Sequence, residues 1–250
     1  VRIKDNEGEL ILEFADPVIT ETKTTVSGVV LDITDDRADP RRGFRIEAYR
    51  NQTPPSEDKD PDYFVDNISA SIYLPIGDDS TWAFNYQTSD AVVSREGISD
   101  PNLILIEEQI PCPYALCPED IKTRVDSISA ARKNGTARTL GGDQLMRAFP
   151  QGRFAGAHML YYSSEFRWNF VTDVIPISFW IWEDIATSMQ LAFFHEVGSV
   201  SELAEKLGEE IRSCSGLGFR MVSASGFVYR ADYAFSDEES ATTVMVQYPW

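Results

Sequence analysis

Residues 159–170 read MLYYSSEFRWNF and alternate between two chemical classes of side chain. Phe166 and Trp168 lie on one side of this pattern, while Glu165 and Arg167 lie on the other. Successive side chains of a β-strand point to opposite faces of its sheet. The stretch therefore predicts a long strand with one apolar, aromatic face and one polar face.

The same period-two pattern recurs along the whole chain and predicts about ten strands. Many of them run nine to fourteen residues, longer than the ~5–6 of an average strand and long enough for a tilted strand to cross a bilayer. The candidate strands are 8–14, 24–34, 43–50, 63–74, 81–94, 157–170, 187–198, 211–224, 227–236 and 242–250.

The connections between these candidates alternate between short and long. Residues 76–80 and 223–226 are tight turns, whereas 51–62, 199–210 and about 95–156 are long. Short turns on one rim and long loops on the other are typical of outer-membrane barrels. We therefore predict an all-β fold, an antiparallel transmembrane β-barrel domain that occupies residues 1–250.

The alternative is a soluble β-sandwich or a lipocalin-like barrel, in which the apolar faces point inward. Alternation alone does not distinguish the two. The membrane barrel is favoured by long strands, by apolar faces rich in large aromatic side chains and by polar faces that carry charges of both signs. Trp82 and Trp168, near strand ends, fit the aromatic girdles of such barrels.

Composition excludes several other classes of protein. The chain has 250 residues with 40 acidic against 22 basic side chains, a formal charge of −18, which argues against a nucleic-acid binder. The longest apolar stretch, Val174–Trp182, is interrupted by Pro176 and is far shorter than the ~18 residues of a membrane-spanning helix. Because the chain begins at Val1 without a signal peptide, we expect a mature product, an expressed segment or a fragment.

The cysteines suggest a disulfide rather than a metal site. Cys112 and Cys117 lie in the proline-rich stretch PCPYALCPED, where a local disulfide is plausible in an oxidising compartment. A zinc site is disfavoured because there is no second cysteine pair and His158 and His195 are the only histidines. Cys214 is left over and is interpreted as a small strand residue. No phosphate-binding loop or nucleophile elbow is present, so we predict no cofactor, no metal and no enzymatic activity.

Three segments resemble a known family. They are LDITDDRADPRRGFRIE (31–47), TLGGDQLMRAFPQGRFAGAHMLYYSSEFRWNF (139–170) and FRMVSASGFVYRADYAFSDEESATTVMVQYPW (219–250). Together they are similar to the bacterial surface antigen family, the barrel domain of BamA-type outer-membrane assembly factors. The resemblance runs from Lys23 to Trp250. It implies that this chain is the C-terminal portion of a sixteen-stranded barrel in a Gram-negative outer membrane, without the periplasmic POTRA domains. The alternative is a short divergent member of the family with fewer strands.

The resemblance also implies a site. In the family, the long loop before the twelfth strand folds into the barrel lumen and carries a Val/Ile-Arg-Gly-Phe/Tyr motif at its tip. The matching loop here is 95–156, and Ala148 in place of the glycine puts a left-handed backbone at this position in doubt. The predicted loop motif comprises Met146, Arg147, Ala148, Phe149, Gly152, Arg153 and Phe154.

By the same likeness, the loop-tip arginine contacts carboxylates on the inner wall of the barrel. The matching acidic residues are Glu165 and Glu196, and both lie on the polar face of their predicted strands. A buried arginine needs such partners. Arg230 and Asp232 share one face of their strand and are predicted to form an ion pair in the lumen.

The C-terminal strand completes the resemblance. Tyr248 and Trp250 lie two residues apart in the last candidate strand, as expected of an aromatic signal on the strand that closes the barrel. In the family this strand meets the first strand at a weak seam, where client strands are thought to enter the bilayer. The stretch VIPISFWIWEDI (174–185) departs from the expected short turn and is predicted to lie along the membrane interface.

The resemblance implies a protein that assists the insertion or translocation of unfolded outer-membrane proteins. Its partners would be these clients, outer-membrane lipids and lipopolysaccharide, and accessory lipoproteins or further membrane proteins, with no nucleic acid. An alternative is a passive outer-membrane pore or membrane anchor without insertase activity, which the change of glycine to Ala148 favours. A third and less favoured class is a soluble β-sandwich binding protein.

Overall fold

The computed structural model describes residues 2–4, 10–13, 23–179, 182–223 and 227–250. Nine strands form one antiparallel sheet in which each strand pairs with its neighbours in sequence. In chain order they are β3 (Thr25–Thr34), β4 (Gly43–Thr53), β5 (Asp62–Ile76), β6 (Ser80–Arg95), β7 (His158–Phe179), β8 (Trp182–Ser201), β9 (Arg212–Ser223), β10 (Val228–Phe235) and β11 (Ser240–Val246).

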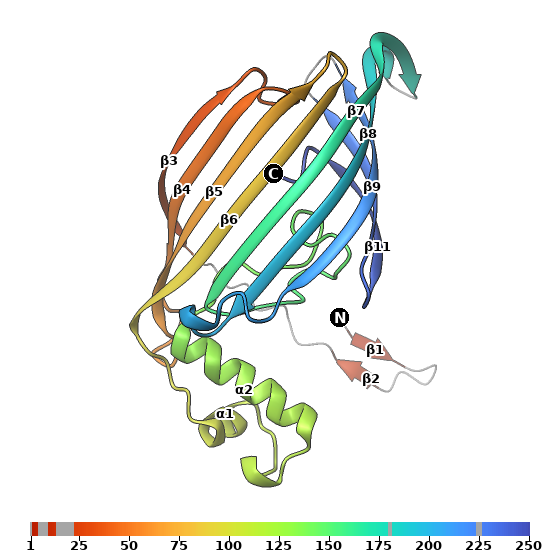
Figure 1. Cartoon of the computed structure of the whole chain (residues 1–250). Helices are drawn as coiled ribbons and strands as arrows, with labels where there is room; N and C mark the ends of the chain where they lie inside the picture. The colour runs from red at the N-terminus through yellow and green to blue at the C-terminus, as the bar shows by residue number, and fades with distance from the viewer. Residues whose placement is uncertain (1, 5–9, 14–22, 180–181, 224–226) are drawn as a thin grey trace.

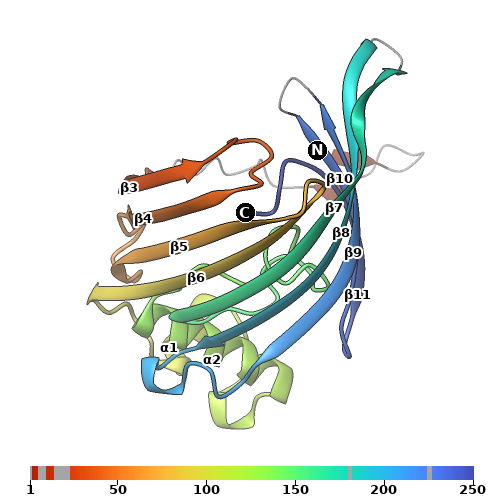
Figure 2. The ribbon, with the colours of Figure 1, turned by 45° about the horizontal axis from the view of Figure 1, so that its top comes forward.

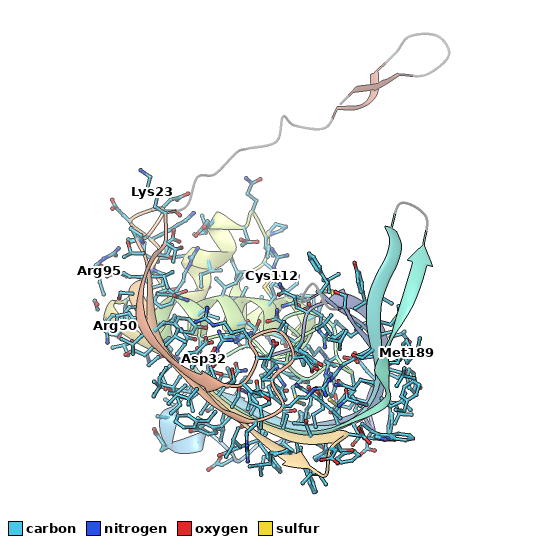
Figure 3. The ribbon with its side chains drawn as sticks, turned by 90° about the horizontal axis from the view of Figure 1, so that it is seen from above. Lys23, Asp32, Arg50, Arg95, Cys112 and Met189 are labelled. Carbon is cyan, nitrogen blue, oxygen red and sulfur yellow. A yellow bond between two sulfur atoms is a disulfide. The ribbon has the colours of Figure 1, made fainter. Side chains whose placement is uncertain are left out.

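The sheet curls strongly about its concave face (Figures 1 and 2). Seen from above, its strands follow a curved wall (Figure 3). Within the described part of the chain, β3 and β11 are the outer strands, and no hydrogen-bonded pairing joins them. The predicted all-β antiparallel architecture is confirmed at this level.

The remaining elements lie outside this sheet. Among the described residues, the strands β1 (Arg2–Lys4) and β2 (Leu10–Glu13) pair with each other and not with the nine-stranded sheet, so the prediction of 8–14 as a strand of the barrel sheet is wrong. The helices are α1 (Pro101–Glu107), η1 (Tyr114–Leu116), α2 (Glu119–Asn134) and η2 (Ala204–Lys206). Among the described helices, none has the length and apolar character needed to cross a bilayer.

The predicted division into short turns at one end of the sheet and long connections at the other is met only in part. The β3–β4 connection (35–42) is as long as the β4–β5 connection (54–61), and the short β10–β11 turn (236–239) lies at the same end as the β8–β9 connection. The turns between β3 and β4, and between β5 and β6, lie at the end drawn uppermost in Figure 1. The helices α1 and α2 and the β8–β9 connection lie at the opposite end. The predicted long loop 95–156 is therefore divided, because 101–134 forms a helical insert at this end, while 136–157 folds against the concave face (Figure 2).

The apolar side chains face outward and the polar side chains face the concave side. On β6, Trp82 and Tyr86 expose 43% and 37% of their surface, whereas Ala83 and Asn85 expose 0% and 3%. The apolar faces of the candidate strands are thus the exposed ones, which is the reverse of a water-soluble sandwich. The inner face of β5 to β10 is buried where the segment 136–157 and the C-terminal residues cover it, whereas that of β3 stays exposed.

β7 and β8 form one hairpin that is longer than the sequence predicted. The ladder continues through Ile175↔Thr187, Pro176↔Ala186 and Ile177↔Ile185, with shifts of register before it. The predicted strand bounds 157–170 and 187–198 are therefore too short, because β7 continues to Phe179 and β8 begins at Trp182; β-branched and aromatic residues favour strand pairing. The location of this stretch along the membrane interface stays a prediction. Pro176 lacks an N–H group and is tolerated beside an irregular ladder.

The last strand is shorter than predicted. β11 ends at Val246, and Gln247 follows with a left-handed φ of 88°. Tyr248 and Trp250 were expected on this strand, but they turn toward the concave face instead. The Oη of Tyr248 donates a hydrogen bond to Asp39, 2.5 Å away, and lies 3.1 Å from the side-chain oxygen of Gln190. These contacts explain why Tyr248 leaves the line of β11. The contact with Asp39 connects the C-terminal segment, which follows one edge strand, to the turn after β3, the other edge strand.

Candidate functional site

The segment 136–157 forms a compact inner loop whose tip is residues 145–149. An isolated antiparallel bridge pairs Leu140 with Phe154 at the base of the tip. Gly142 donates from its backbone N–H to the carbonyl of Phe149 at 2.9 Å, and Phe149 donates to the carbonyl of Met146 at 3.0 Å. The backbone thus satisfies much of its own hydrogen bonding away from water.

The only left-handed non-glycine residue among those described in the inner loop is Met146, with φ of 57°. Ala148, which stands where the family has glycine, does not share this conformation. Its side chain is 1% exposed. The methyl group is therefore accommodated without backbone strain at this position.

Apolar packing holds the loop tip against the wall. Leu145, Met146 and Phe149 are buried and pack in one cluster with Tyr161 of β7 and Phe194 of β8. Gly198 of β8 makes the close approach possible, because an added Cβ would lie 2.5 Å from Leu140 Cδ1 and 3.2 Å from Met146 Sδ.

Arg147 lies at the centre of this tip, and its side chain has no exposed surface. Its Nε donates to Glu196 at 2.8 Å, its Nη1 to Asp232 at 2.7 Å and its Nη2 to Glu165 at 3.2 Å. Its backbone N–H donates to the second oxygen of Glu196 at 2.7 Å. The guanidinium also stacks on the ring of Phe194 at 3.4 Å. One loop residue therefore ties together β7, β8 and β10.

The carboxylates keep Arg147 charged. Burial alone lowers the pKa of this guanidinium, but the charges of Glu196, Glu165 and Asp232 outweigh burial and raise the pKa above its ordinary value. Tyr161 adds a hydrogen bond from its hydroxyl to Glu196 at 2.8 Å. The Arg147 guanidinium is therefore a permanent positive charge on the inner loop, bound by the carboxylates of Glu165, Glu196 and Asp232.

Three further arginines of the inner wall surround the same carboxylates. Arg220 donates to Glu165 at 2.7 Å, Arg167 donates to Glu165 at 2.7 Å, and Arg230 donates to Asp232 at 2.8 Å. We call these seven residues the buried charge cluster, and they are Arg147, Glu165, Arg167, Glu196, Arg220, Arg230 and Asp232.

The structure brings together five of the predicted site residues, namely Arg147, Glu165, Glu196, Arg230 and Asp232. Arg167 and Arg220 were not predicted. The sequence contained a signal for both. Arg167 shares the polar face of its strand with Glu165, and Arg220 lies on the inward face of β9, opposite the buried Gln190 of β8. A charge count on the inward faces would have identified them.

The other predicted loop residues lie apart from the buried charge cluster. Gly152 has a φ of 68° and forms a turn. Arg153 has a half-exposed side chain 3.7 Å from Glu239. Phe154 packs its ring against Phe149 with centroids 5.0 Å apart.

Tyr248 and Trp250 contact the buried charge cluster from the turn end of the sheet, the end that carries the β3–β4 and β5–β6 turns. The guanidinium of Arg167 lies 4.0 Å from the ring centre of Tyr248 and 5.4 Å from that of Trp250. Both residues therefore lie in the concave space instead of on a strand of the sheet.

Cys112 and Cys117 form a disulfide in the helical insert. Cys117 packs with Ile104, Leu105 and Val125 in a small apolar core.

The helical insert is also tied to the β4–β5 connection by charge. Lys59 Nζ lies 2.6 Å from Glu107 Oε1, and Arg132 lies 2.9 Å from Glu107 Oε2. The hydrogen bond from Lys59, with help from Arg132, lowers the pKa of Glu107 below its ordinary 4.5.

No chemistry for a metal ion emerges from the part of the chain that the structure describes. Within those residues, no group of three or more His, Cys, Asp or Glu side chains is arranged to hold an ion. The main feature of the site is the set of buried ion pairs through which Arg147 fixes the inner loop to β7, β8 and β10.

No family model matches the chain, and a search of curated proteins finds no similar one. The resemblance to the bacterial surface antigen family therefore stays a prediction based on the residues quoted above.

Proposed function

We propose that this chain is part of an outer-membrane β-barrel protein of the BamA type, which assists the insertion or translocation of unfolded outer-membrane proteins. The observation that carries the proposal is the burial of Arg147 against Glu165, Glu196 and Asp232. The family likeness implies an arginine on an inner loop bound to wall carboxylates, and this geometry matches that expectation.

The exposed apolar face supports a membrane location. On neighbouring strands, Ile72, Trp82, Phe193 and Leu217 expose between 43% and 52% of their surface. Contiguous apolar surface of this kind is unfavourable in water but is the normal exterior of a membrane barrel. Polar side chains on the concave face suit a hydrated or plugged interior.

The open edge of strand β3 supports a barrel with more strands than the described sheet. Val29 on its outward face is 73% exposed, and Val30 on its inward face is 60% exposed. An unpaired strand edge is costly inside a bilayer because its backbone groups lack hydrogen-bond partners. We propose that further strands of the protein pair with β3, and that the barrel has sixteen strands in total.

In this proposal the protein performs no covalent chemistry. The buried charge cluster fixes the inner loop and the curvature of the wall, and the barrel perturbs the bilayer and offers strand edges to clients. Its partners are unfolded clients, membrane lipids and lipopolysaccharide, together with accessory lipoproteins or further membrane proteins.

The alternative is a passive pore or membrane anchor. The feature that favoured it was Ala148, yet this residue has no left-handed backbone to strain. Electrical recording separates the two functions. A stable, ion-selective conductance without any effect on client folding would support the pore.

The test replaces Arg147 with Ala in the full-length protein and measures the folding rate of a client barrel into liposomes that contain it. Arg153→Ala is the matched control, because Arg153 belongs to the same loop but its side chain is 50% exposed. We expect Arg147→Ala to slow client folding and the control to leave it unchanged. Equal rates for both variants and the wild type would contradict the insertase proposal.

A further inference from the structure

A cavity of about 340 Å³ lies near the turn end of the sheet, between the β3–β4 turn and the C-terminal segment. Its walls come from both ends of the strand order, since β3, β4 and β5 contribute on one side and β10 and residues 247–250 on the other. The residues that matter here are Thr34, Arg37, Arg45, Tyr73, Tyr248 and Trp250.

The lining is cationic. It contains Arg37 and Arg45 and, among the described residues that line it, no carboxylate. Arg37 uses its Nε toward Asp32 at 3.5 Å, and Arg45 uses one Nη toward Glu47. A guanidinium has five N–H donors in a planar fork, so each arginine retains donors that these ion pairs do not use.

A third arginine adds positive potential from behind the lining. The guanidinium of Arg167 lies 5.6, 4.0 and 5.4 Å from the ring centres of Tyr73, Tyr248 and Trp250, three of the cavity walls. Its Nη1 and Nη2 are buried and have no hydrogen-bond partner among the described residues. The buried charge cluster holds four arginines against three carboxylates, so it carries one uncompensated positive charge beside the cavity.

We propose that this cavity binds an anion with the chemistry of a phosphate group. Arginine is the side chain best suited to phosphate, because its fork matches two phosphate oxygens at once. The source is either free inorganic phosphate or the headgroup of an anionic phospholipid. The proposal stands on the cavity and its charges and does not depend on the insertase function.

The experiment measures binding calorimetrically with the full-length protein in an uncharged detergent. Two probes are used, inorganic phosphate and a short-chain phosphatidylglycerol. The variants are Arg37→Gln and Arg45→Gln, each of which removes one lining cation. Arg50→Gln is the control, because Arg50 lies on the same strand as Arg45 but pairs with Asp66 at 2.7 Å away from the cavity.

We expect each lining variant to weaken binding by about tenfold or more, the usual loss for one charge-assisted hydrogen bond, and the control to bind as the wild type does. The probe that binds identifies the source, and binding of either supports the proposal. Because the Arg37 side chain is 87% exposed, its loss should not prevent folding. Binding of neither probe, or binding by Arg37→Gln and Arg45→Gln as tight as that of the wild type, would overturn the proposal. Such a result with client folding intact would leave the proposed function standing.

Discussion

Replacing Arg147 with Met should destabilise the protein strongly through one carboxylate in particular. Glu165 keeps Arg167 and Arg220, and Asp232 keeps Arg230. Glu196, in contrast, has no other cation within ion-pair distance among the described residues. The variant leaves this carboxylate fully buried with only the Tyr161 hydroxyl, the Cys214 thiol and a backbone N–H as donors.

The expected loss of unfolding free energy follows from the uncompensated charge of Glu196. Breaking a buried ion pair by removing one partner costs about 3–5 kcal/mol, because the other charge remains without compensation. Neutralising Glu196 in the double variant Arg147→Met/Glu196→Gln should recover most of this loss. The cycle should therefore give a coupling energy of about 2 kcal/mol or more.

The measurement is equilibrium unfolding in detergent micelles by guanidinium chloride, followed by tryptophan fluorescence, with reversibility checked first. Arg153→Met serves as the control and should change stability by less than about 0.5 kcal/mol, as exposed substitutions usually do. A loss below 1 kcal/mol for Arg147→Met, or a double variant no more stable than the single one, would refute the reasoning.

Three further predictions concern other parts of the fold. Gly216→Ala should cost about 1–3 kcal/mol in unfolding free energy, because an added Cβ would lie 2.2 Å from Phe194 Cζ and 2.4 Å from the carbonyl oxygen of Tyr233; no loss would contradict the close packing. Since the pKa of Glu107 is lowered in the fold, its tie to the β4–β5 connection should hold above about pH 4.5 and weaken as the pH falls through the lowered value. The hydrogen-exchange protection of residues 101–134, corrected for the intrinsic exchange rate at each pH, should then fall in the wild type, and a Glu107→Gln variant showing the same pH dependence would argue against this origin. Reduction of the Cys112–Cys117 disulfide should speed proteolysis within the helical insert and leave the strands protected, so equal cleavage before and after reduction would count against a supporting role.

Alternation predicted the strands and their faces well because it reflects a purely local rule. Glu165 and Arg167 are two residues apart and therefore share the inner face whatever the rest of the chain does. The exposure of Trp82 and the burial of Asn85 follow the same rule. What alternation could not decide is which face is covered, since that depends on the inner loop and the C-terminal segment.

The failures have different causes, and one of them is a contact between residues distant in sequence. The turn of Tyr248 away from β11 depends on Asp39, which lies 209 positions earlier in the chain. The helices α1 and α2 were missed because the segment 95–156 was treated as one loop, and α2 contains only one buried apolar residue, Val125. The extension of β7 to Phe179 and of β8 back to Trp182 was missed because a short turn was expected from the family pattern.

The most direct test of the central claim measures where the outward face of the sheet lies. Single spin labels would be placed along β6 at positions 82 to 87 in protein reconstituted into lipid vesicles, and their collisions with oxygen and with a water-soluble nickel complex compared. The account predicts that labels at Trp82, Phe84 and Tyr86 meet oxygen from the lipid, while labels at Ala83, Asn85 and Gln87 do not. Water accessibility at the outward positions, or a protein that remains soluble without detergent, would contradict a membrane barrel.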